Sequence, residues 1–170
     1  MIFRLLDASE IDVRVATVKD TGISLLLYKD ARCDMNILDE TIGSEKWQRR
    51  HYDCKGNLFC SVGILTGTGW VWKDDCGVES YTEKQKGEAS DSFKRACFNW
   101  GVGRELYTAP FIWIPVNKVK IVSTGNKKTT YDRFYVEKIA YDDKRKISGL
   151  SIKNQDDKRV FIWQKEEAKK

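Results

Sequence analysis

The sequence predicts an α+β protein in which an antiparallel β-meander packs on a long α-helix, with a small antiparallel β extension at the C-terminal end. Two observations predict this fold class. Several short segments alternate apolar with polar residues and are separated by Gly, Asn and Asp turns, and one longer segment, residues 82–100, has apolar residues at helical spacing. In a chain of 170 residues we expect one core over residues 1–110 and an extension over 111–170.

The N-terminal segment predicts a β-hairpin followed by a short helix. Residues 11–17 alternate in polarity, residues 20–22 (DTG) form a turn, and residues 23–28 return as the second strand. The apolar spacing becomes helical after Asp30, which is placed to cap a helix that ends at Gly43.

The central segment predicts the meander and the long helix. Strands are expected over 47–53, 58–65 and 70–73. The helix is expected to begin at a capping box in residues 82–85 (TEKQ) and to end at Gly101. Its predicted core stripe comprises Ala89, Phe93, Ala96, Cys97 and Trp100. Asp91, Lys94, Arg95 and Phe98 are then expected on a neighbouring flank of the helix.

The C-terminal third predicts further strands and is basic. The strands are expected over 119–123, 130–141, 147–153 and 160–163. Residues 117–170 carry 15 basic and 8 acidic side chains, whereas residues 1–116 carry 15 basic and 17 acidic ones. This asymmetry suggests a polyanionic partner, although Lys and Arg in hairpin loops also serve only as a solubilising surface.

Several function classes lack the residues that their chemistry needs. No P-loop motif occurs, so ATP-driven activity is not expected. The five cysteines form no CxxC pair, and His51 is the only histidine, which favours reduced thiols over disulfides, structural zinc or thiol catalysis. We expect no enzyme activity, no cofactor and no metal. The sequence shows neither an apolar run long enough to span a bilayer nor a signal peptide. The expected location is therefore the cytoplasm of a bacterium or of a phage-infected host.

The second helix carries a more specific signal. Residues 87–96 (GEASDSFKRA), 100–104 (WGVGR) and 106–107 (LY) resemble single-strand annealing proteins of the Rad-fifty-two type, especially their phage and bacterial branch. Supporting matches are residues 11–14 (IDVR) and 70–72 (WVW), and the resemblance spans about residues 11–107. The C-terminal strands also look like the tail of the phage branch.

The resemblance implies an ATP-independent protein of homologous recombination and DNA repair that binds and anneals single-stranded DNA. It implies a β-β-β-α core that assembles into rings or helical filaments, with the DNA in a basic outer groove. The matching positions here are Arg14, Tyr28, Lys94 and Arg95, with Arg104 as a secondary candidate. A single-strand-binding protein or an exonuclease is a possible partner, and no membrane is involved. The sequence departs from the family pattern at Phe98 and Glu105.

Each candidate residue also has a structural interpretation. Arg95 follows Asp91 by four residues and could form an ordinary helix ion pair, and Lys94 could simply be solvated. Arg14 could pair with a neighbouring acid, Tyr28 could be a core aromatic, and Arg104 could bind the C-terminal carbonyls of the helix.

Other functions remain open at this point. The same fold could protect or load single strands without annealing them. A metal-dependent nuclease would need a carboxylate cluster that the sequence does not show, and a purely structural protein could assemble through unpaired strand edges. The lysines at 118, 120, 127, 128, 144 and 146, with Arg145, are a candidate second DNA-binding region.

Overall fold

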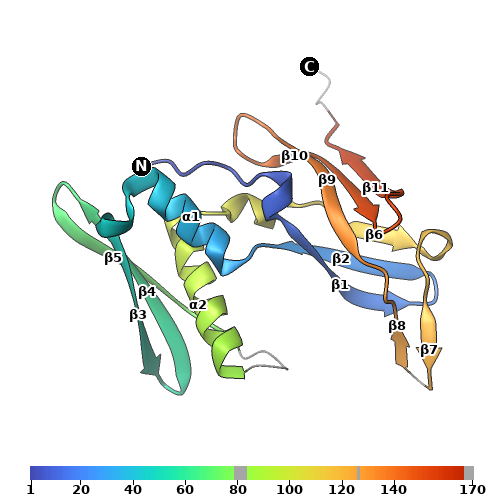
Figure 1. The fold of residues 1–170 in the computed structure, drawn as a ribbon, viewed down its shortest axis with the longest axis horizontal. Coiled ribbons are helices and arrows are strands. Elements are labelled where there is room, and N and C mark those ends of the chain that lie inside the picture. The colour runs from blue at the N-terminus through green and yellow to red at the C-terminus, as the bar shows by residue number, and fades with distance from the viewer. Residues whose placement is uncertain (79–83, 126, 167–170) are drawn as a thin grey trace. The chain divides into compact units, whose positions relative to one another are not determined.

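The computed structural model describes residues 1–78, 84–125 and 127–166 (Figure 1). Strands account for 46% of the chain and helical segments for 26%, so the protein is mostly β. The chain forms two compact units. Unit 1 comprises residues 1–5 and 30–104, and unit 2 comprises residues 6–29 together with the chain from residue 105 onward.

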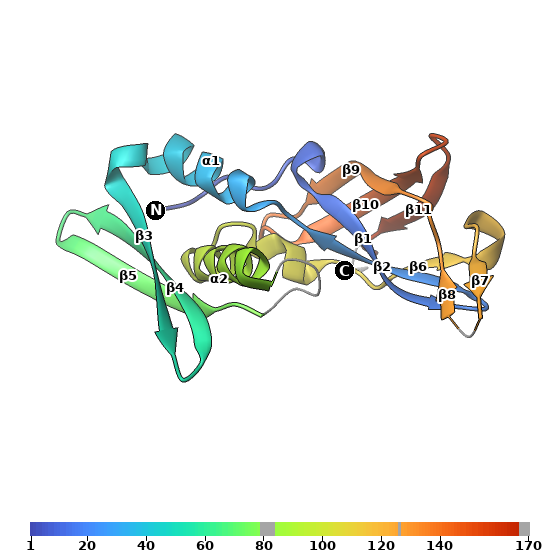
Figure 2. The same cartoon turned by 60° about the horizontal axis from the view of Figure 1, so that its bottom comes forward.

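Unit 1 contains a three-stranded antiparallel sheet and the two α-helices found among the described residues. The chain runs through α1 (Ala31–Ile42), the 3₁₀ turn η2 (Ser44–Lys46), and then the strands of the sheet and α2. These are β3 (Trp47–Cys54), β4 (Asn57–Thr66), β5 (Gly69–Cys76) and α2 (Lys84–Trp100). The order of strands in the sheet is β3-β4-β5, and α2 packs on β4 and β5 (Figure 2). The buried hydrophobic residues between the sheet and α2 include Cys60, Val62, Ile64, Phe93, Ala96 and Cys97.

Local signals in unit 1 explain where its elements begin and end. The Asp30 side chain accepts a hydrogen bond from the backbone N–H of Arg32, which confirms the predicted N-cap of α1. Gly43 follows that helix with a φ of 88°, as predicted for its C-terminal residue. The predicted capping box of the second helix includes residues 82 and 83, which lie outside the described residues.

Unit 2 is built around a six-stranded antiparallel sheet. The strands, in the order in which they pair, are β11 (Arg159–Gln164), β10 (Ile147–Asn154), β9 (Phe134–Tyr141), β1 (Asp12–Lys19), β2 (Gly22–Tyr28) and β6 (Ile112–Pro115). A separate hairpin consists of β7 (Val122–Thr124) and β8 (Lys127–Thr129). The remaining short elements are η1 (Ala8–Glu10), η3 (Arg104–Thr108) and η4 (Val116–Lys118). The buried core of the unit includes Ile23, Leu25, Ile112, Ile114, Val136, Leu150, Ile152 and Val160.

The predicted fold class, a meander packed on a long helix with a small appendage, is wrong. The largest element is the six-stranded sheet, which is nearly closed and barrel-like, and the two α-helices are short. The N-terminal hairpin belongs to this sheet, because β6 pairs with β2 and β9 pairs with β1. Leu25 lies opposite Ile112, a partner more than 80 residues away, and the polarity pattern of a strand does not identify a partner at such a distance.

The compact units also divide the chain differently from the expected boundary at residue 110. The hairpin of residues 12–28 packs with the C-terminal strands in unit 2, and residues 111–170 are part of that larger sheet. Two expected strands are displaced: the segment predicted over 119–123 is β7, and the segment predicted over 130–141 begins only at Phe134. Among the described residues, neither α-helix has the length and apolar character needed to cross a membrane.

Candidate nucleic-acid interface

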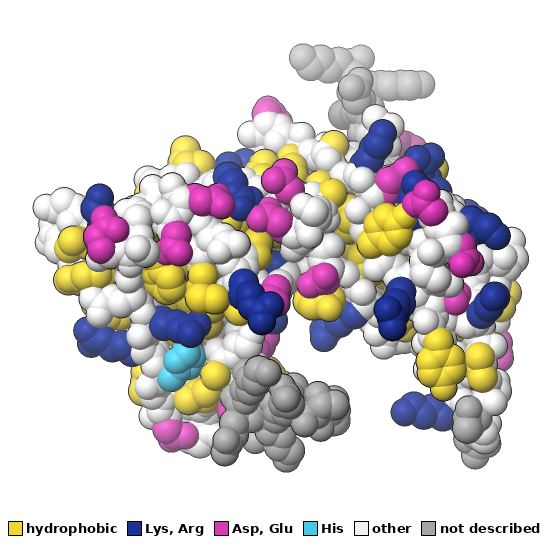
Figure 3. Space-filling view, in the orientation of Figure 1, with side chains coloured by type: hydrophobic (Ala, Val, Ile, Leu, Met, Phe, Trp, Pro, Cys, Tyr) yellow, Lys and Arg dark blue, Asp and Glu magenta, His cyan; other side chains and the backbone are white. Residues whose placement is uncertain are grey.

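On the face drawn in Figure 3, charged side chains of both signs lie on both units. Charge alone therefore does not single out a binding site. The arrangement of cations against exposed aromatic rings is more selective, because a nucleic-acid strand needs both charge neutralisation and stacking surfaces.

Arg14 and Tyr28 come together on the outer face of the hairpin β1–β2. In a strand, alternate side chains point to opposite faces, so Arg14, Leu26 and Tyr28 lie outward while Leu25 is buried. The guanidinium carbon of Arg14 lies 6.0 Å from the centre of the Tyr28 ring, within cation–π distance. Tyr28 is 39% exposed, so it is not a core aromatic, and no ion pair joins Arg14 to any residue that the structure describes.

Strand β6 extends this surface with two aromatic residues. Trp113 lies opposite Ser24 of β2, and Phe111, just before β6, stacks on it with ring centres 6.3 Å apart and planes 18° apart. Phe111 is 77% exposed and Leu26 is 47% exposed. We call this surface the hairpin face, formed by Arg14, Leu26, Tyr28, Phe111 and Trp113. An exposed apolar patch of this kind is a candidate binding surface.

The two aromatic residues of β6 were missed by the sequence analysis. The signal was present in residues 111–115 (FIWIP). Aromatic side chains at 111 and 113 alternate there with isoleucines at 112 and 114, as is typical of a strand with one buried face. Ile112 and Ile114 are buried, and this places Phe111 and Trp113 on the outer side.

Lys94 and Arg95 lie on α2 in unit 1, next to each other in sequence. The Nε of Arg95 donates to Oδ1 of Asp75 on β5 at 3.2 Å, and both side chains are partly exposed. Lys94 is half-buried, and none of the described residues forms a hydrogen bond or an ion pair with its side chain. Of these two cations, the Lys94 ammonium group is therefore more readily available to a phosphate than the Arg95 guanidinium group.

Arg104 has a structural role at the end of α2. Its guanidinium donates to the carbonyl oxygen of Phe98 at 2.6 and 3.0 Å and to that of Asn99 at 3.0 Å. Lys73 donates to the same Asn99 carbonyl at 2.8 Å. These cations satisfy carbonyls that the last turn of a helix leaves without partners. The structural interpretation of Arg104 is thus the one that the structure supports.

The sequence-predicted site residues fall into two groups. Arg14 and Tyr28 belong to unit 2, whereas Lys94, Arg95 and Arg104 belong to unit 1. In unit 2, Arg14 lies next to Tyr28. In unit 1, Arg95 forms a hydrogen bond with Asp75, which is not one of the predicted site residues. Each group is therefore a separate candidate contact region for a strand.

Glu105, a departure from the family pattern, is explained by the fold. It is buried, at 4% exposure, and its Oε1 accepts a hydrogen bond from the backbone N–H of Leu6 at 2.8 Å. A buried carboxylate with such a bond anchors the chain that leads into the hairpin. Glu105 thus has a structural role inside unit 2.

Some lysines of the candidate second DNA-binding region already bind oxygen atoms of the protein itself. Lys128 forms an ion pair with Asp20, and Lys118 donates to the carbonyl of Val160 at 3.4 Å. Outside this region, Lys165, just after β11, pairs with Asp142, just after β9, at 2.9 Å.

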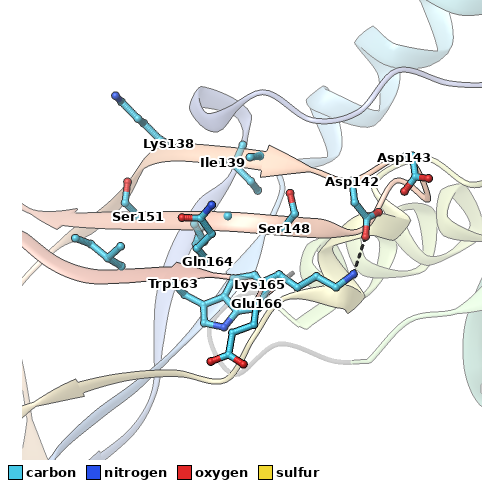
Figure 4. A pocket seen from close by; sticks show the side chains of 14 residues that line it. Lys138, Ile139, Asp142, Asp143, Ser148, Ser151, Trp163, Gln164, Lys165 and Glu166 are labelled. Carbon is cyan, nitrogen blue, oxygen red and sulfur yellow. Dashed lines mark hydrogen bonds and ion pairs between the residues drawn. The ribbon is translucent and has the colours of Figure 1, made fainter. Parts of the chain in front are cut away.

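A pocket lies over strands β9, β10 and β11 (Figure 4). Small residues, among them Gly149, Ser148 and Ser151, line it, and Figure 4 shows Lys165 reaching across to Asp142. The hydrogen bond from Lys165 is the main reason that the pKa of Asp142 is lowered. Within residues 1–78, 84–125 and 127–166, no three His, Cys, Asp or Glu side chains gather to form a metal site.

Neither a family model, nor a curated protein, nor a solved structure matches this chain. Only the residues of the chain itself and the motif resemblance described above bear on its function.

Proposed function

We propose that this protein binds single-stranded DNA and anneals complementary strands, without nucleotide hydrolysis, in homologous recombination and DNA repair. The observation that carries the proposal is the hairpin face, where Arg14 lies over the exposed Tyr28 beside the stacked pair of Phe111 and Trp113. As part of the same proposal, the chain acts as a homo-oligomeric ring or filament, which follows from the motif resemblance.

Exposed rings and cations suit a single strand for physical reasons. Stacking of a base on an aromatic side chain contributes about 1–3 kcal/mol and tolerates any sequence, since every base has a flat face. Arg14, Lys94 and Arg95 provide positive charge for the phosphates, and each phosphate contact releases counterions. Binding of this kind is independent of sequence and weakens as the salt concentration rises.

The same geometry supports annealing. A base that stacks on a ring still presents its Watson–Crick edge, so a second strand can test complementarity by pairing. Neutralised phosphates repel that second strand less. The protein then supplies geometry and charge, and base pairing supplies the free energy.

The annealing rate of two complementary fluorescent oligonucleotides, measured without ATP or metal, tests the proposal. We expect wild type to accelerate pairing, and the Arg14→Ala variant and the Lys94→Ala/Arg95→Ala double variant to lose about tenfold or more of that acceleration. For single strands the dependence of log affinity on log salt should become shallower by about 0.7 for each phosphate contact removed. Arg32→Ala removes an exposed cation from α1 and is the matched control.

Other outcomes would replace the proposal with a competing function. Tight binding that slows pairing would indicate strand protection or loading. No affinity for single strands at low salt would indicate a structural assembly protein. Degradation of the labelled strand after divalent metal is added would indicate a nuclease.

A further inference from the structure

The face of the β3–β5 sheet that does not carry α2 displays aromatic residues from all three strands. Tyr52 of β3 lies opposite Phe59 of β4. Arg50 of β3 lies opposite Ser61 of β4, which in turn lies opposite Asp74 of β5. Leu65 lies opposite Trp70, and Gly63 lies opposite Trp72. We call this surface the meander face, formed by Arg50, Tyr52, Phe59, Leu65, Trp70 and Trp72.

The rings of the meander face form two stacked pairs. Tyr52 and Phe59 have ring centres 5.6 Å apart with planes 22° apart, and Trp70 and Trp72 have ring centres 5.9 Å apart with planes 29° apart. Tyr52 is 40% exposed and Trp70 is 39% exposed. Each pair therefore offers at least one ring to a partner.

A glycine and an arginine hold Trp72 in place. A Cβ at Gly63 would lie 2.7 Å from the Trp72 ring, so the indole lies against the Gly63 backbone where no side chain intervenes. The guanidinium carbon of Arg50 lies 4.1 Å from the centre of the same ring, close enough for a cation–π contact. The arginine is thus positioned between the two stacked pairs along the sheet.

The meander face carries one cation, Arg50, from the edge strand β3, and Lys55 follows that strand in the turn to β4. Arg49 lies on the other face of the sheet, with its guanidinium carbon 4.8 Å from the centre of the Phe93 ring of α2, and Lys46 pairs with Glu45 at 3.7 Å. The acid on the face itself, Asp74, accepts a hydrogen bond from the Tyr52 hydroxyl at 3.3 Å.

We propose that the meander face is a second surface for single-stranded nucleic acid, on which bases stack while Arg50 contacts the phosphates between them. This inference rests on the proposed function and extends it to a second, separate surface in unit 1. Successive rows of outward side chains are about 7 Å apart along a strand. A sheet that displays aromatic residues in this way stacks about two or three bases.

A second copy of the chain suits this face less well. An isologous dimer centred on the face would bring the Arg50 side chains of the two copies together near the two-fold axis and remove like charges from water. Ser61 and Asp74 also lie in the same central row as Arg50, which gives the middle of the face a polar character.

Affinity for two ligands of equal length tests the proposal: a fluorescent oligo(dT) strand and a fluorescent abasic strand with the same phosphates. The full chain is compared with the Tyr52→Leu/Trp70→Leu double variant, which removes two partly exposed rings. Tyr131→Leu, which removes an exposed ring of unit 2, is the matched control. Circular dichroism and the thermal midpoint establish that each variant is folded.

We expect wild type and the control to prefer oligo(dT) over the abasic strand. The double variant should lose this preference by about tenfold or more, with its affinity for the abasic strand changed less than about twofold. Arg50→Gln removes no aromatic residue from the face and should lower the affinity for both strands, with a salt slope shallower by about 0.7.

An unchanged preference in the folded double variant, while Arg14→Ala and Lys94→Ala still weaken binding, would overturn this inference and leave the proposed function standing. A change in the sedimenting mass of the double variant without a change in affinity would assign the face to a second copy. Failure of wild type to bind either strand would overturn the proposed function together with this inference.

Discussion

Arg95 of α2 donates its Nε to Oδ1 of Asp75 on β5 at 3.2 Å, so the basic flank of the helix is tied to the sheet beneath it. The side chains are 39% and 25% exposed, and a partly exposed pair of this kind contributes at most about 1 kcal/mol to stability. Its larger consequence is electrostatic, because Asp75 lowers the positive potential that Arg95 offers to a phosphate.

Asp75→Asn is expected to tighten the binding of single-stranded DNA. Removing the carboxylate leaves the Arg95 charge without this partner and removes a charge that repels phosphate, so we expect a gain of a few-fold at low salt. Fluorescence anisotropy with a labelled oligonucleotide measures it. Asp143→Asn removes an equal charge from the exposed turn before β10 and should change the affinity less. Equal effects of the two substitutions would show that only net charge matters.

Glu137 makes the stability of unit 2 depend on acidic pH. The hydrogen bond from Arg159 is the main cause that lowers the pKa of Glu137 from 4.5 to about 2, and the hydrogen bond from Ser151 also contributes. Because the pKa is lower in the folded state, the stabilisation is complete above about pH 4.5 and is lost as the pH falls toward 2.

The Glu137→Gln variant should therefore lose stability relative to wild type above pH 4.5, and the difference should shrink between pH 4.5 and 2. Urea unfolding at a series of pH values measures this. Glu45→Gln removes an exposed carboxylate that pairs with Lys46 at 3.7 Å and is the control. If the free energies of unfolding of wild type and Glu137→Gln changed in parallel with pH, the ionised Glu137 carboxylate would not be the source of the stabilisation.

Gly77→Ala is expected to destabilise unit 1. A Cβ at this position would lie 2.2 Å from the carbonyl oxygen of Glu88 and 2.9 Å from the backbone nitrogen of Ser92, so α2 would have to move. Overpacking of this kind costs about 1–3 kcal/mol. At Gly67 nothing lies within 4 Å of an added Cβ, so Gly67→Ala should change the free energy of unfolding little. Similar unfolding midpoints for the two variants would show that the contact is not close.

The cysteines should react with alkylating reagents in a definite order. Burial raises the pKa of the Cys60 thiol to about 11, despite the opposing charge of Arg49, whereas Cys54 is exposed. Because the thiolate is the reactive form, we expect Cys60 to react roughly a hundredfold or more slowly than Cys54 near neutral pH. Mass spectrometry after brief treatment with iodoacetamide measures the order. Cys54→Ser should abolish the fast reaction, and rapid labelling of Cys60 would show that the sheet is open on the α2 side.

Local features of the sequence predicted many individual elements. The cap at Asp30 and the ending at Gly43 confirm the predicted bounds of α1, because these signals act between residues a few positions apart. The strands predicted over 47–53 and 58–65 correspond to β3 and β4, which pair through a short turn. Neighbouring strands with a short connection have little choice of partner.

Features that depend on distant residues were not predicted. The association of β2 with β6 places Trp113 opposite Ser24, and this pairing forms part of the hairpin face. Likewise, Arg104 carried a residue type suited to phosphate, but the structure shows it bound to helix carbonyls. The identity of a cation does not reveal which oxygen it contacts.

The sequence by itself determined the helix caps, the turns, the polarity of each strand and the short list of basic and aromatic candidates. These depend on backbone preferences and on a local alternation of polar and apolar residues. Only the tertiary structure decided that the N-terminal hairpin joins the C-terminal strands, and which rings remain exposed beside Arg14 and Arg50. The physical reason is that strand pairing and burial are collective: each edge accepts whichever partner completes the most hydrogen bonds and buries the most apolar surface across the whole sheet.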